Sequence, residues 1–98
     1  MSEHDQRQYR RIRDRLAAFE SGEITLDKAV IDLEGLLNSL EMTDEPWKEA
    51  FRHHWSTLET ARALLRSGEV SELSIEANHA VGNATSQLRL LVSAKLVI

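Results

Sequence analysis

The segment TDEPWKEAFRHHWSTLE, residues 43–59, carries the clearest helix start in the chain. Thr43 or Asp44 can cap this helix, because a short oxygen-bearing side chain accepts a hydrogen bond from the first free backbone amides. Pro46 fits the first turn, where its missing amide has no intrahelical partner. Apolar residues then recur every three or four positions and predict one inward face: Trp47, Phe51, Trp55 (or His54), Leu58, Ala61 and Leu65.

Turn-forming residues on either side of this segment divide the chain into four helices. Gly22 and Gly68 suit the left-handed position that follows a helix end. Thr25 is a cap candidate for the second helix, and Ser71 or Ser74 for the fourth. We therefore expect a single all-α domain with helices at about 3–21, 25–41, 44–67 and 72–95.

The short connections between these helices favour antiparallel neighbours. The sequence therefore predicts an antiparallel up-down four-helix bundle, with a three-helix core and a loose first or fourth helix as the alternative. Gly82 and Asn83 are poor helix formers within the fourth helix, so a bend or a close contact is expected there. The apolar faces predicted for the other helices are Tyr9, Ile12, Leu16 and Phe19; Leu26, Ala29, Val30, Leu33, Leu36, Leu37 and Leu40; and Leu73, Ala77, Ala80, Ala84, Leu88, Leu91 and Lys95.

Composition excludes several classes of protein. The 98 residues include no cysteine, which rules out disulfides, zinc-thiolate sites and a thiol nucleophile. No apolar run is long enough to cross a bilayer and the amino terminus is polar, so we expect a soluble cytoplasmic protein without membrane contacts. The formal net charge of −4 argues against a nucleic-acid binder, which needs a basic surface.

The negative charge is concentrated in the middle of the chain. Residues 20–49 hold nine acids and two lysines, a balance of −7, whereas residues 1–19 carry +2 and residues 50–98 carry +1. The basic stretch from Arg7 to Arg15 is typical of a solvated helix face whose arginines pair with acids of the second helix. The central acids can equally be the ordinary solvated face of one helix and the first turn of the next.

One apolar residue stands out within this acidic region. Asp27, Glu34 and Glu41 lie seven residues apart, on the flank opposite the Leu33 and Leu37 stripe. Ile31 lies between them, as an apolar residue does at the centre of a charged interface, although scattered exposed apolar residues are common. The predicted protein-binding residues are Asp27, Ile31, Glu34, Asn38, Glu41, Asp44 and Glu45.

The sequence offers little for catalysis. Of the four histidines, no pair has the spacing of a helical zinc site with a third ligand, and His53 and His54 point about 100° apart on a helix. We expect His54 at the edge of the core and His53 in solvent. No phosphate-binding loop, G-x-S-x-G elbow or H-E-x-x-H motif is present. We expect no catalytic residue, no metal and no cofactor, and therefore a protein that is not an enzyme.

The first 60 residues resemble a family of small bacterial immunity proteins from contact-dependent inhibition and related polymorphic toxin systems. The resemblance rests on a Phe-Glu-x-Gly-Glu-Ile-x-Leu turn (19–26), a Leu-rich helix ending in Leu-Glu (33–41), and a Trp-x-x-x-Phe-x-x-x-Trp-x-x-Leu-Glu helix (47–59). It implies a stoichiometric inhibitor that binds a toxin domain, often a nuclease with a basic cleft. From Thr60 onward the sequence shows no such resemblance.

The expected function is thus an immunity protein whose partner is a cognate toxin C-terminal domain, with the free protein a monomer or weak dimer. The alternative is a helical structural or regulatory module that homo-oligomerises, or docks on a housekeeping protein, through its Ala-rich fourth helix and the apolar tail 96–98. A DNA-binding regulator that uses the Arg7 to Arg15 helix is a third reading.

Overall fold

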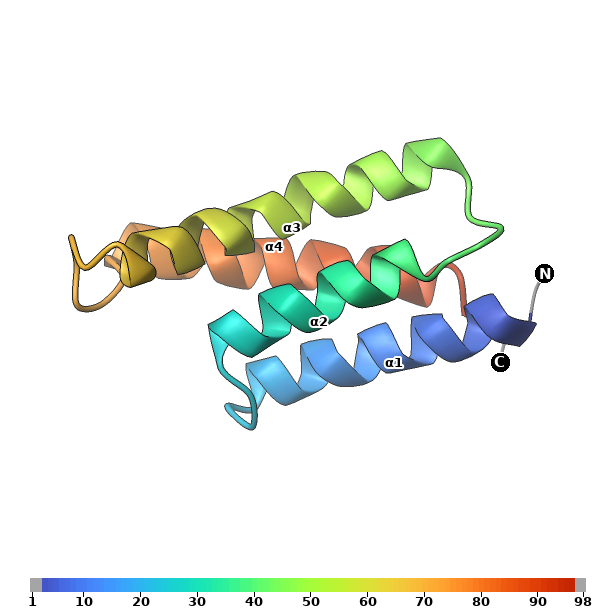
Figure 1. Cartoon of the computed structure of the whole chain (residues 1–98), viewed down its shortest axis with the longest axis horizontal. Coiled ribbons are helices and arrows are strands. Elements are labelled where there is room, and N and C mark those ends of the chain that lie inside the picture. The colour runs from blue at the N-terminus through green and yellow to red at the C-terminus, as the bar shows by residue number, and fades with distance from the viewer. Residues whose placement is uncertain (1–2, 97–98) are drawn as a thin grey trace.

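The computed structural model describes residues 3–96, which form four helices and, within that range, no strand (Figure 1). Successive helices run in opposite directions in Figure 1. Each helix packs against two others in a ring, so that α2 and α4 occupy diagonal corners. The predicted all-α four-helix bundle is confirmed, and the three-helix alternative is wrong because α1 and α4 both contribute to one core. The helices are α1 (Glu3–Glu20), α2 (Leu26–Asn38), α3 (Glu45–Arg66) and α4 (Ile75–Ser93).

Local signals in the sequence set the helix ends. Thr25, Asp44 and Ser74 cap α2, α3 and α4, each with its side-chain oxygen accepting a hydrogen bond from the amide three residues later. Asp44 rather than Thr43, and Ser74 rather than Ser71, are therefore the caps. Gly22 and Gly68 have φ of +83° and +79°, the left-handed conformation expected after α1 and α3.

Two helices are shorter than expected. α2 ends at Asn38 rather than near residue 41, because Ser39 closes the helix and its hydroxyl donates to the Leu36 carbonyl. Glu41 therefore lies in the link to α3, not on the face of α2. α4 begins at Ile75 instead of 72, and it runs through Gly82 without interruption.

The core joins all four helices around the aromatic residues of α3. Trp47 stacks on Phe51 with ring centroids 5.3 Å apart, and Tyr9 of α1 meets the Trp47 ring edge-on at 5.6 Å. The Trp47 indole N–H donates to the Leu91 carbonyl of α4 at 3.0 Å. The inward faces predicted for α1, α2 and α3 are confirmed at the residues that are fully buried: Tyr9, Ile12, Leu16, Ala29, Val30, Leu33, Leu37, Leu40, Trp47, Phe51, Leu58 and Ala61.

The inward face of α4 differs from the prediction. Ala80 is exposed, and Ala77 and Lys95 are only partly buried. The helix is rotated because it must cover α1 as well as α3, which turns β-branched side chains inward. The buried residues of α4 are Val81, Ala84, Thr85, Leu88 and Val92.

The α3 and α4 hairpin is longer than the α1 and α2 pair and extends beyond it at one end (Figure 1). Within the described residues, no helix combines the length and apolarity required to span a membrane. Val97 and Ile98 of the predicted apolar tail lie outside the described residues. Leu96, the third residue of that tail, is partly buried against the core.

Candidate functional site

The outward surface of α2 carries the centre of the predicted binding site. Ile31 is 54% exposed, so about half of this aliphatic side chain is open to contact from outside the bundle. Glu34 and Asn38 lie one and two turns further along, and both are exposed. Gly35 is also exposed on this side. We call these four residues, Ile31, Glu34, Gly35 and Asn38, the outer α2 face.

Gly35 has no role in the packing of its own chain. A Cβ atom at this position would meet nothing within 4 Å, and its backbone φ is not positive. A glycine within a helix costs about 1 kcal/mol relative to alanine. The missing side chain therefore leaves a low point beside Ile31 that another molecule can approach closely.

A groove runs along the α1 edge of this face. It has a volume of about 480 Å³ and is lined by Arg11, Arg15, Ile31, Asp32, Gly35 and Leu36. At its floor Asp32 Oδ2 lies 3.1 Å from the Lys28 ammonium and 3.5 Å from Arg15 Nε. The expected pairing between α1 arginines and α2 acids is thus confirmed at Arg15. Arg11, by contrast, donates a hydrogen bond to the neutral Gln8 side chain at 3.4 Å and forms no ion pair with the residues between 3 and 96.

Asp27 lies at the other edge of α2, where it forms ion pairs with two arginines of α3. Its Oδ1 accepts a hydrogen bond from Arg62 Nε at 2.6 Å and lies 3.5 Å from Arg66. The bond from Arg62 lowers the pKa of the Asp27 carboxyl below its ordinary value. Asp27 and Glu59 form a network with Arg62 and Arg66, two acids with two cations, so the negative charge of Asp27 is balanced within the fold.

Asp44 has two structural partners. One carboxylate oxygen accepts the Trp47 amide as the cap of α3, and the other lies 2.8 Å from the Lys95 ammonium after α4. The hydrogen bond from Lys95 lowers the pKa of Asp44 and raises that of Lys95. Glu45 is exposed and lies 3.8 Å from Lys48 on its own helix.

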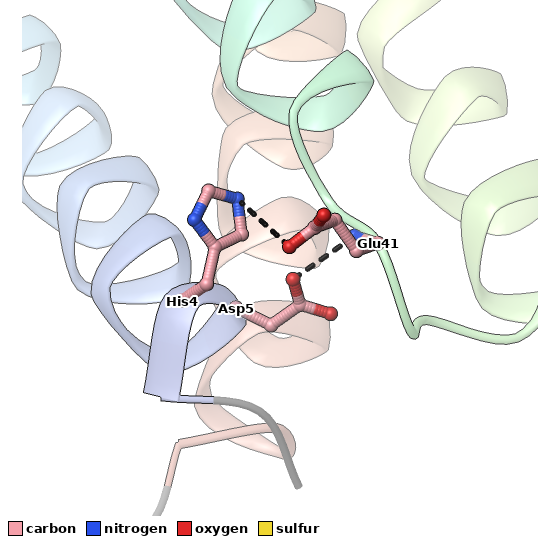
Figure 2. Close-up of side chains that lie close together, drawn as sticks. All are labelled: His4, Asp5 and Glu41. Carbon is pink, nitrogen blue, oxygen red and sulfur yellow. Dashed lines mark hydrogen bonds and ion pairs between the residues drawn. The ribbon is translucent and has the colours of Figure 1, made fainter.

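Glu41 belongs to a polar cluster between the start of α1 and the α2–α3 link. Figure 2 shows His4 and Asp5 of α1 pointing toward Glu41. Asp5 is 1% exposed, and its two oxygens accept the Glu41 and Met42 amides at 2.9 and 2.8 Å. His4 Nε2 donates to the Ser39 carbonyl at 2.8 Å and lies 3.7 Å from Glu41 Oε1 (Figure 2).

Among residues 3–96 these three are also close enough to be considered as metal ligands, because their ligand atoms lie within 4.8 Å of one another. In the structure, however, the His4 nitrogen that faces the group carries a proton shared with Ser39, and both Asp5 oxygens receive backbone amides. A metal ion would have to displace the proton on His4. His4, Asp5 and Glu41 therefore form a hydrogen-bonded clasp that holds the α2–α3 link against the start of α1.

The histidine predictions of α3 are confirmed. His53 is exposed and His54 is half-buried, with ring centroids 5.1 Å apart. Burial is the main cause that lowers the pKa of His54 below its ordinary value. The nearby Ser56 hydroxyl donates to the His53 carbonyl, not to an imidazole.

The structure thus separates the predicted residues into two groups. Ile31, Glu34 and Asn38 share one outward face, whereas Asp27, Asp44 and Glu41 sit at contacts between helices. Glu45 belongs to neither group, because it is exposed at the start of α3 and pairs with Lys48 of the same helix. Sequence reasoning did not single out Gly35 or Arg11, although a glycine inside a helical pattern was a usable signal.

Comparisons of this chain with known protein families, with curated proteins and with solved structures find no match.

Proposed function

We propose that this protein is an immunity protein that binds a toxin domain, a nuclease with a basic cleft, through the outer α2 face. The observation that carries the proposal is Ile31, an aliphatic side chain that is more than half exposed on a rigid helix. Beside it, Gly35 leaves room for close approach. An apolar centre surrounded by polar residues is the usual anatomy of a protein interface.

Glu34 is the acid of the outer α2 face that favours a basic partner, and Arg11 and Arg15 line the α1 edge of the adjoining groove. Within residues 3–96 Glu34 forms no ion pair, so its charge is available to a ligand. Glu41, in the link before α3, and Glu45, at the start of α3, are also exposed. Complementary charge steers association, and close packing at an apolar centre slows dissociation.

The resemblance of the first 60 residues to immunity proteins supports the same proposal. Those residues contain all of α1 and α2 and more than half of α3. The outer α2 face therefore lies within the part of the chain that carries the resemblance. Inhibition by occlusion of a cleft requires a rigid surface and no catalytic group, and a bundle held by capped helices supplies such a surface.

The test is binding of the toxin domain encoded beside this gene, measured as association and dissociation rates, together with protection of toxin-sensitive cells. Ile31→Asp should accelerate dissociation at least about 25-fold, the equivalent of a 2 kcal/mol hot spot. Glu34→Lys should slow association and change its salt dependence. Both residues are exposed, so both variants should keep the thermal stability of the parent within a few tenths of a kcal/mol.

Asp27→Lys is unsuitable as a test, because it would place a cation against Arg62 and Arg66 and weaken the α2–α3 contact itself. Matched controls lie on the diagonal helix α4. Leu90→Asp removes a similarly exposed aliphatic side chain, and Glu76→Lys reverses an exposed charge. Equal loss of binding in the α2 variants and the α4 controls, or no complex with the toxin at all, would refute the proposal.

A further inference from the structure

The outward face of α4 exposes two large aliphatic side chains that the bundle does not use. Ile75 is 77% exposed in the first turn, and Leu90 is 63% exposed in the last turn. His79, Gly82 and Ser86 continue the same row between them, at spacings of three or four residues that keep one side of a helix. We call these five residues, Ile75, His79, Gly82, Ser86 and Leu90, the outer α4 face.

Gly82, in the middle of this face, has no function within its own chain. A Cβ atom there would meet nothing within 4 Å, and the residue lies in an ordinary helical conformation. Alanine would stabilise an isolated helix by about 1 kcal/mol at this position. The glycine lowers the surface at the midpoint of the helix, between two protruding aliphatic side chains.

The positions of Ile75 and Leu90, and those of His79 and Ser86, are symmetric about the point between 82 and 83. If a second α4 lies antiparallel across this point, each residue faces the one at equal distance on the other side. Ile75 then meets Leu90 of the second copy, and His79 meets Ser86. At the centre Gly82 meets Asn83 of the second copy, and the missing side chain of Gly82 leaves room for that amide, so the two helices can approach and both aliphatic pairs can make contact. Because the operation is a two-fold rotation, each pair forms twice.

We propose that the outer α4 face binds a second copy of this chain in this antiparallel register. The lack of charge on this face supports a second copy of the chain as its partner. None of the five residues is Asp, Glu, Lys or Arg, so the face complements an uncharged surface rather than a basic cleft. The surface is small compared with the 20 to 30 residues a side of stable complexes, so the dimer is weak and depends on concentration. α4 is diagonal to α2 in the ring, so such a dimer leaves both outer α2 faces accessible.

Cysteine crosslinking tests the register directly, because the chain contains no native cysteine. The single variants Ile75→Cys and Leu90→Cys should not crosslink to themselves, since equivalent residues lie about 22 Å apart along antiparallel helices. A mixture of the two should form a disulfide-linked heterodimer under mild oxidation, because positions 75 and 90 face each other. Arg52→Cys, an exposed position on α3, measures random collisions.

Sedimentation of the uncrosslinked protein tests whether the dimer exists. The parent should show a monomer–dimer equilibrium in the micromolar to sub-millimolar range, and Leu90→Lys should weaken it at least tenfold. Met42→Lys is the matched control, because Met42 is 74% exposed but lies in the α2–α3 link. A parent that stays monomeric throughout this range would overturn the proposal. So would single-cysteine variants that crosslink as readily as their mixture. Neither result bears on toxin binding by α2.

Discussion

Asp5 is expected to be the most important polar residue for the stability of this bundle. It is 1% exposed, and its carboxylate accepts the amides of Glu41 and Met42. Asp5→Ala removes both acceptors at once, so the two partly buried amides must hydrogen-bond to water instead. A hydrogen bond to a charged group contributes about 1.5 to 3 kcal/mol. Because water can reach part of the link, we expect the lower end of that range for each bond, or about 3 kcal/mol in total.

Glu3→Ala is the matched control. Glu3 and Asp5 are both acids of the first turn of α1, so both interact with the helix dipole, but Glu3 is exposed. That variant should lose only the dipole contribution of about 0.3 to 1 kcal/mol. Asp5→Asn keeps the shape but places an NH₂ group against one backbone amide, so it should fall between the two alanine variants.

Urea denaturation followed by tryptophan fluorescence gives the comparison. A loss of about 3 kcal/mol lowers the denaturation midpoint by about 1 to 3 M, given the usual urea dependence of small domains. Hydrogen exchange should show faster exchange at the Glu41 and Met42 amides than in the control. If Asp5→Ala and Glu3→Ala have the same midpoint, the hydrogen bonds between Asp5 and the Glu41 and Met42 amides do not stabilise the fold, and the prediction is wrong.

Three further predictions concern the contacts between helices. Phe51→Ala should destabilise the protein by about 3 to 5 kcal/mol, since Phe51 is fully buried, and near-parental stability in calorimetry would contradict its place in the core. Trp55→Phe should cost about 1 kcal/mol, because the indole N–H donates to the Val30 carbonyl at 3.0 Å; urea titration measures the loss. The lowered pKa of Asp44 means that its pair with Lys95 stabilises the fold above the ordinary carboxyl pKa, and this contribution disappears as the pH falls through the lowered value. Asp44→Asn keeps a good helix cap but removes the titration, so its stability should depend less on pH in acid than that of the parent; equal slopes would refute the assignment.

The sequence alone determined the helices and most of their inward faces. The Thr25 cap acts on an amide three residues away, and Gly22 and Gly68 act on their own backbone, so these signals need no tertiary information. For α3 and α4 the sequence left two cap candidates each, and the structure selects Asp44 and Ser74. The spacing of Tyr9, Ile12 and Leu16 likewise predicts burial, because a helix presents residues three or four apart on one side.

The rotation of α4 could not be derived in this way. Its alanines give almost equally apolar rows on two sides, and the choice between them depends on which helices it contacts. Packing against α1 as well as α3 buried Val81 and Thr85 and left Ala80 outside.

The roles of the acids were also decided by tertiary structure. Asp5, Asp27 and Asp44 are all acids near a helix start, and nothing in the sequence identifies their partners on other helices. Their partners lie 35 to 51 positions away, at Glu41, Met42, Arg62 and Lys95. A carboxylate is fixed by whichever donor the folded chain brings within about 3 Å, and that distance is set by the packing of helices rather than by local spacing. Ile31 remained exposed for the same reason, because no other helix of the ring covers the outward side of α2.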